Sequence, residues 1–232
     1  MPANLNRFIN QLKHAPQRPD VFNPWWQTDP EYDIDESAAE IRREQLRCYL
    51  KERIGKAQFL LLAEAIGYQG GHFSGIAMTS ERILLGGKTH QGIIPQMVFQ
   101  SIPPQRTSKP ELKPNGFSEN TATIVWGKII ELGLDPYDII LWNAYPWHPF
   151  KPEKGGLTNR TPDAGELAVG CQLLKQMIHL TGVRHVIAIG NKSHQVLQRA
   201  GVATVKVRHP ANGGATQFRN QFEAYLQSIM YG

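Results

Sequence analysis

The protein has 232 residues, of which 41% are hydrophobic and 19% charged, and its formal net charge is +5. This composition supports a folded core and excludes a disordered chain, and the length fits one compact domain. No hydrophobic run approaches the roughly 20 residues that a membrane span needs, and the N-terminus lacks a signal-peptide core, so we expect a soluble, cytoplasmic protein.

The chain is expected to begin with an irregular N-terminal arm, residues 1–35, that packs on the body and contains the stretch NPWWQTDPEYD. Residues 36–232 are expected to form a single domain. A first helix is predicted over residues 37–54, because Ser37 and Glu40 have the spacing of a capping box.

Four short segments are predicted to be strands: 58–64, 138–143, 185–190 and 203–208. The first three are nearly continuous hydrophobic runs, as is typical of parallel strands covered on both faces. The fourth alternates hydrophobic and basic residues, which favours a strand at the edge of the sheet.

Helices are predicted between and after these strands. One covers residues 120–132, with Gly133 as its C-terminal cap. Another starts with Thr161 as the N-cap and Pro162 as the first helical residue, and it continues to about residue 180. A short helix over 192–200 and a C-terminal helix complete the chain. Alternating strands and helices indicate an α/β fold, an α/β/α sandwich around a mostly parallel sheet.

Polar or glycine-rich segments follow all four predicted strands. These segments are Glu64 with the glycines of residues 67–75, NAYPWHPF (143–150), GNKSH (190–194) and RHPANGG (208–214). Ligands bind outside the carboxyl ends of parallel strands, so the pattern predicts a site where these segments meet.

Each candidate residue also has a structural interpretation. The glycines fit tight turns, and neither nucleotide-binding glycine fingerprint is present. Glu64 fits a helix cap, Asn143 a cap at the strand end, and His148 a structural role. His209 precedes Pro210 and a glycine turn, where a rigid sheet would hold its ring at the site, and we interpret it as functional.

No cofactor or metal is expected. The histidines lack the spacing of metal ligands, and Cys48 and Cys171 are too few for a thiolate cluster. We interpret both cysteines as free thiols, which suits a reducing cytoplasm. The positive net charge suits a polyanionic partner such as nucleic acid.

Three motifs, in this order, resemble the uracil-DNA glycosylase superfamily. The first active-site motif of the family, in its GEAPG form, resembles AEAIGYQGGHFSG (63–75). The family's strand that ends in the base-reading asparagine resembles LWNAYPWHP (141–149), and its second motif resembles VRHPANGG (207–214). The resemblance runs from about residue 40 to the C-terminus. It implies a three-layer sandwich with a four-stranded parallel sheet, and hydrolysis of the N-glycosidic bond of uracil or a related deaminated base in DNA.

The resemblance also assigns roles to residues. Glu64 and His209 would be catalytic, the first orienting water or stabilising the sugar cation and the second donating to the departing base. Asn143 would pair with the base edge, next to Tyr68, Phe73 or Met78 as the stacking side chain. Loops near DNA and phosphate would comprise Gly67, Gln69, Gly70, Gly71, Asn191, Lys192, Ser193, Pro210, Ala211, Asn212 and Gly213.

The sequence departs from the family pattern at several positions. Ile66 and Ala63 replace the proline and first glycine of GEAPG, and Met78 stands where an aromatic residue is usual. Ala65 replaces the aspartate of the best-known branch, and the iron-sulfur cysteines of the GEAPG branch are missing. No large hydrophobic side chain follows His209 in its loop.

We therefore carry three hypotheses. The first is a monomeric DNA glycosylase whose partner is DNA with a deaminated base, acting away from membranes. The second is a non-catalytic nucleic-acid-binding member of the same fold. The third is a cytosolic α/β enzyme that acts on free nucleotides or nucleosides.

Overall fold

The computed structural model describes residues 2–14 and 17–230, and its centre is a parallel sheet of four strands. The strands are β2 (Phe59–Ala65), β3 (Ile139–Tyr145), β5 (His185–Ile189) and β6 (Val205–Val207), in the spatial order β3-β2-β5-β6. Every pairing is parallel, with Phe59 opposite both Ile139 and His185. The four predicted strands and their parallel arrangement are thus confirmed.

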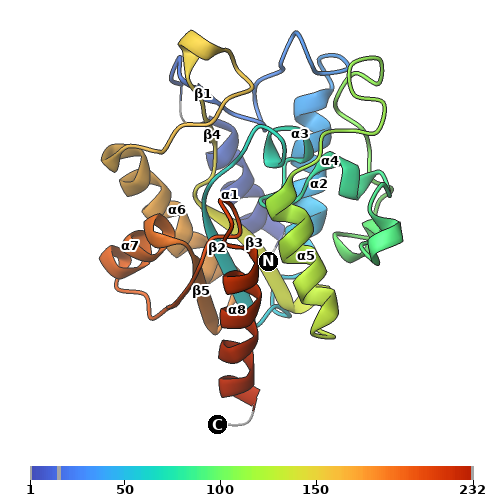
Figure 1. Cartoon of the computed structure of the whole chain (residues 1–232). Coiled ribbons are helices and arrows are strands. Elements are labelled where there is room, and N and C mark those ends of the chain that lie inside the picture. Colours follow the sequence, from blue (N-terminus) through green and yellow to red (C-terminus); the bar gives the residue numbers. More distant parts are fainter. Residues whose placement is uncertain (1, 15–16, 231–232) are drawn as a thin grey trace.

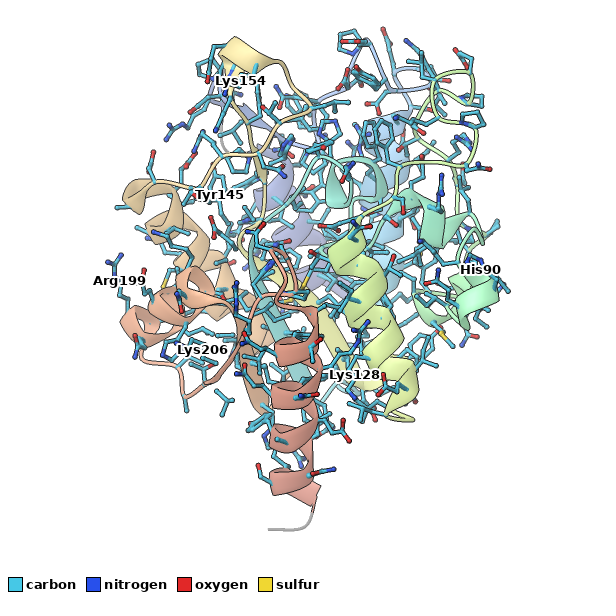
Figure 2. All side chains as sticks on the ribbon, viewed as in Figure 1. His90, Lys128, Tyr145, Lys154, Arg199 and Lys206 are labelled. Atoms are coloured by element: carbon cyan, nitrogen blue, oxygen red, sulfur yellow. The ribbon has the colours of Figure 1, made fainter. Side chains whose placement is uncertain are left out.

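Helices cover both faces of this sheet (Figure 1). The helices α6 (Ala164–Thr181) and α7 (Asn191–Ala200) lie on one side, and α5 (Asn120–Glu131) and α8 (Ala215–Met230) lie on the other. The predicted three-layer α/β/α sandwich is therefore confirmed. Lys128 of α5 donates to Glu223 of α8 over 2.7 Å and lies between these helices in Figure 2.

Shorter elements connect these layers. The short strand β1 (Val21–Phe22) pairs antiparallel with β4 (His148–Pro149). Two helices have a single turn, α3 (Gly71–Ser74) and α4 (Glu81–Leu84). The 3₁₀ turns are Thr89–Gln91, Pro95–Met97, Pro136–Asp138 and Pro152–Lys154. Within the described ranges, no helix is both long and hydrophobic enough to cross a membrane.

The expectation of an irregular arm is wrong for its first part, which is the helix α1 (Pro2–His14). Leu5, Phe8, Ile9 and Leu12 recur at the spacing of one helix face, and all four are buried. The helix packs against α2 (Ala38–Lys51) and α6, beside the edge strand β3.

The rest of the arm is fixed to α2 by a buried ion pair. Arg42 of α2 donates to Asp33 over 2.8 Å, and both side chains are fully buried. The same guanidinium donates to the backbone carbonyls of Pro24 (2.6 Å) and Gln27 (2.8 Å). A buried cation with this many partners holds the irregular backbone against the body.

Two predicted helix starts differ in detail. Ser37 makes no capping hydrogen bond to α2, because its hydroxyl donates to Asp35 instead. Asp163, not Thr161, caps α6, since its side chain accepts from the Glu166 N–H and the Glu166 side chain accepts from the Asp163 N–H, both over 2.8 Å. Gly133 follows the end of α5 with φ +66°, as predicted for a cap.

Candidate active site

A cleft of about 770 Å³ opens at the carboxyl ends of β2, β5 and β6. Glu64 lies in β2. The other lining residues come from the ends of β5 and β6 and the segments after them, and they include 189–192, 206–209, 211 and 212. The structure therefore brings together the two residues predicted to be catalytic, Glu64 and His209. It also brings the predicted loop residues Asn191, Lys192, Ala211 and Asn212 to the same cleft.

The hydrogen bonds of His209 fix where its proton lies. The backbone N–H of Ala211 donates to Nδ1 of His209 over 3.1 Å, so Nδ1 is an acceptor and the neutral ring carries its proton on Nε2. Burial, and then the nearby Arg208, lowers the pKa of His209, so the ring is neutral at neutral pH. His209 thus presents a free Nε2–H donor at the cleft.

Gly190 allows this ring to sit close to the end of β5. A Cβ atom at Gly190 would lie 3.3 Å from Cβ of His209, and the residue has φ +93°, which side chains rarely adopt. A larger residue at position 190 would displace the histidine.

Glu64 is half-buried, and no described residue donates a hydrogen bond to its carboxylate. A carboxylate without a protein donor is open to water or to a ligand at the cleft.

Asn143 lies outside the residues that line this cleft, buried in β3 opposite Ala63 of β2. Its Oδ1 atom is sealed from solvent and has no partner among the described residues. Buried amide oxygens are nearly always paired, so this atom marks a position where a donor is missing.

The glycines after β2 each have a neighbour in the protein. A Cβ at Gly70 would lie 2.2 Å from Oε2 of Glu119, and one at Gly67 would lie 3.4 Å from Oε1. A Cβ at Gly71 would approach the Ile66 side chain to 3.1 Å, while Gly75 has φ +74° and packs against Arg42. A side chain at these positions would crowd these neighbours, which is the physical reason that glycine occurs there.

Glu119 is a residue that the sequence did not single out. It precedes α5, yet its carboxyl does not cap that helix but lies against the loop of residues 67–71, hereafter the glycine loop. Oε2 is sealed and unpartnered among the described residues, and burial raises the pKa of Glu119 to about 7. Asn159, also missed, accepts from the N–H of Tyr68 over 3.1 Å and so holds the same loop.

Neither contact has a signal in a single sequence. Ser-Glu-Asn before α5 is typical of an ordinary helix start, and Asn159 lies in a loop 91 positions from Tyr68. Only the fold places the two side chains on the glycine loop.

The side chains of two predicted stacking residues are buried in the core. The Phe73 ring is fully buried and stacks on Phe117 at 3.9 Å. Met78 is buried in the main hydrophobic cluster and has φ +46°. Neither side chain offers a free face to a base, so these two assignments are corrected. Tyr68 is half-buried.

The predicted phosphate loops are partly exposed. Asn191, Lys192, Ala211, Asn212 and Gly213 are exposed, whereas Pro210 is buried. Ser193 is also buried and donates to the carbonyl of Ile189 over 2.9 Å, so its hydroxyl serves α7 and not a ligand.

Two basic side chains of the 86–120 loop bind backbone carbonyls, one within the loop and one in the N-terminal arm. Arg106 donates to the carbonyls of Lys113 (2.9 Å) and Pro114 (2.6 Å), and Lys109 donates to those of Pro30 and Glu31, both over 2.9 Å. Exposed cationic side chains lie instead at the cleft: Lys192, Lys206 and Arg208, of which Lys206 donates to Oδ1 of Asn191 over 3.3 Å.

A buried pair of histidines joins the helix α3 to the segment after β3. Nε2 of His148 lies 2.7 Å from the Thr158 carbonyl and must donate to it, so Nδ1 accepts from Nδ1 of His72 over 2.9 Å. Burial lowers the pKa of His148 to about 3, so it stays neutral. The expected structural role of His148 fits this geometry. Among the described residues, no group of three or more potential ligands could hold a metal ion.

Comparisons with known proteins agree with this fold. The family model described as the uracil DNA glycosylase superfamily matches residues 74–229, which include Asn143 and His209 but not Glu64. The crystal structure of wild-type SMUG2 from Pedobacter heparinus matches with a TM-score of 0.62 over 99% of each chain, at 12% identity, and thus shares the fold. No curated protein matches. Since the family model covers more than half of the chain, the protein belongs to the uracil DNA glycosylase superfamily.

Proposed function

We propose that the protein is a DNA glycosylase that hydrolyses the N-glycosidic bond of uracil, or of a related deaminated base, in DNA. The observation that carries this proposal is the shared cleft, in which an unpaired carboxylate, Glu64, and a neutral histidine with a free Nε2–H, His209, lie together. These are the two groups that hydrolysis of a nucleoside bond needs, one at the sugar and one at the base.

The chemistry assigns a task to each group. As the bond between C1′ and the base breaks, positive charge develops on the sugar and negative charge on the base. Glu64 stabilises the sugar and orients the water that adds to C1′, while His209 donates from Nε2 to a base oxygen. A preorganised donor of this kind typically contributes roughly 10²–10³ in rate.

Asn143 supplies recognition in this proposal. Its buried Oδ1 lacks a donor in the described structure, and the ring N–H of uracil would provide one. A base that leaves the amide unpaired would bind less favourably by about 1–3 kcal/mol, so Asn143 favours bases with an N–H at that edge.

The charge around the cleft supports a DNA partner. Lys192, Lys206 and Arg208 are exposed cations beside a single carboxylate, Glu64, and exposed cations bind phosphates by releasing counterions. The base itself would have to leave the helix stack to enter, which costs least for a mispaired or single-stranded base.

One observation favours a second candidate, a member of the fold that binds nucleic acid without catalysis. Phe73 and Met78 are both taken up by the core, so the site lacks the expected stacking platform. Recognition of a flipped base would then depend on Asn143 and Tyr68 alone.

A single experiment separates these functions. Oligonucleotides with one uracil, single-stranded and duplex, are incubated with the wild type, Glu64→Gln and His209→Ala, and then treated with alkali. We expect strand cleavage with the wild type and a loss of about 100-fold or more in both variants. Binding without cleavage by the wild type would favour the second candidate. Absence of both, on a panel of deaminated bases, would favour an enzyme for free nucleotides or nucleosides.

A further inference from the structure

Glu119 is half-buried, and one of its two carboxyl oxygens, Oε2, is buried without a hydrogen-bond donor among the described residues, which is rare and unfavourable. Oε2 is sealed from solvent, and the side chain does not cap α5, although the residue holds the N-cap position. An unpaired buried polar group costs about 1–3 kcal/mol, and a charged one costs more. A protein that keeps such a group has to keep it neutral or move it.

The glycine loop is the cover over this carboxyl. Gly70 lies so close that a Cβ there would be 2.2 Å from Oε2 and 2.7 Å from Cδ of Glu119, and Gly67 lies against Oε1. The loop follows β2 directly, so it starts next to Glu64 at the edge of the sheet where the cleft lies. Its position therefore depends on whether Glu119 can stay beneath it.

The state of the carboxyl is set by burial alone. Burial is the only cause that raises the pKa of Glu119 to about 7, and no charged group in the described part of the chain offsets it. The neighbours that face the carboxyl are Gly67 and Gly70, and the amide of Asn159 lies 3.8 Å from the Cβ position of Gly67. Burial thus favours the neutral carboxyl while the loop covers Oε2, and an ionised carboxylate would need water at that oxygen.

We propose, building on the proposed function, that Glu119 is a positioning residue whose neutral carboxyl lets the glycine loop pack on Oε2 just after the strand that carries Glu64, and that the loop lifts when the carboxyl ionises. Lifting brings water to the carboxylate and moves the backbone next to Glu64. The loop is then closed and competent on the acid side of neutrality, and open on the alkaline side.

Glu119→Gln tests this proposal, because glutamine keeps the shape of a neutral carboxyl at every pH. Single-turnover excision is measured from pH 6.5 to 8.5. The pKa of His209, lowered by burial, favours the neutral ring over this range, and His209 is the same in every variant. If only the neutral form is competent, the wild-type rate falls about 25-fold across this range for a group that titrates near pH 7. Glu119→Gln should lose this dependence and keep the rate of the wild type at pH 6.5. Glu111→Gln, the same change at an exposed position of the preceding loop, should leave the wild-type profile unchanged.

A readout that needs no excision is hydrogen exchange of the peptide covering residues 62–75, corrected for the intrinsic effect of pH. The wild-type peptide should lose protection between pH 6.5 and 8.5, and the Glu119→Gln peptide should not. Gly70→Ala, whose Cβ would push the carboxyl out, should leave the loop unprotected at both pH values. Equal protection of the wild-type loop at both pH values would overturn the inference, even if the protein excises uracil. Glu119-dependent exchange in a protein that excises nothing would uphold it and refute the proposed function.

Discussion

The contact between α6 and β3 makes a sharp prediction about Gly170. A Cβ at this position would lie 1.8 Å from the carbonyl oxygen of Ala144 and 2.9 Å from its carbonyl carbon. Both atoms belong to the backbone of β3, so no side-chain rotation relieves the overlap. Because real Cβ contacts essentially never fall below 3.0 Å, α6 would have to retreat from the strand by at least 1.2 Å, the difference between 3.0 and 1.8 Å.

The cost follows from the residues that this retreat would separate. Leu167 and Leu174 of α6 are buried in the same core as Ile140 of β3. Overpacking of this kind costs about 1–3 kcal/mol or more, and alanine gains back only about 1 kcal/mol of helix propensity. We expect Gly170→Ala to lower the free energy of unfolding by roughly 2 kcal/mol.

Gly127 provides a matched control within the same protein. It lies inside α5, and a Cβ there would have nothing within 4 Å. Gly127→Ala should therefore stabilise the protein by about 0.5–1 kcal/mol through helix propensity. Urea denaturation followed by circular dichroism measures both variants. If Gly170→Ala matched Gly127→Ala, with equal m-values, the close packing of α6 on β3 would be refuted.

Three further predictions concern pH, recognition and charge. Because the pKa of Glu119 is raised from 4.5 to about 7 in the folded state, the folded protein binds the extra proton and its stability falls as pH rises from about 4.5 through 7. Glu119→Gln should therefore be more stable than the wild type by about 3 kcal/mol at pH 8.5 and equal at pH 4, and a constant difference in urea titrations would contradict this. Asn143→Ala should weaken binding of uracil-containing DNA about 5- to 150-fold relative to unmodified DNA in fluorescence anisotropy, whereas equal loss for both DNAs would argue against base recognition. DNA affinity should fall steeply as the salt concentration rises. Replacing the exposed Lys206 by alanine should reduce the slope of the logarithm of the DNA-binding constant against the logarithm of the salt concentration by about one. An affinity that does not depend on salt would point to a small-molecule substrate.

Local patterns determined most of the secondary structure. The three hydrophobic runs became β2, β3 and β5 because a strand covered on both faces has to be hydrophobic along its whole length. Gly133 and Gly201 ended their helices with positive φ, a conformation that depends on the residue itself. The periodicity of Leu5, Phe8 and Leu12 was also present in the sequence, so the helix α1 could have been predicted from it.

The site could be predicted only as far as strand ends determine it. Glu64 and His209 meet because the carboxyl ends of parallel strands share one edge of the sheet. The partners of Phe73 and Gly70 are Phe117 and Glu119, which lie more than 40 residues further along the chain. Such contacts depend on how the long loop between α4 and α5 folds back against α3 and α4. No local pattern encodes that path, so only the tertiary structure decided which aromatic ring is buried and which carboxyl lies beneath the glycine loop.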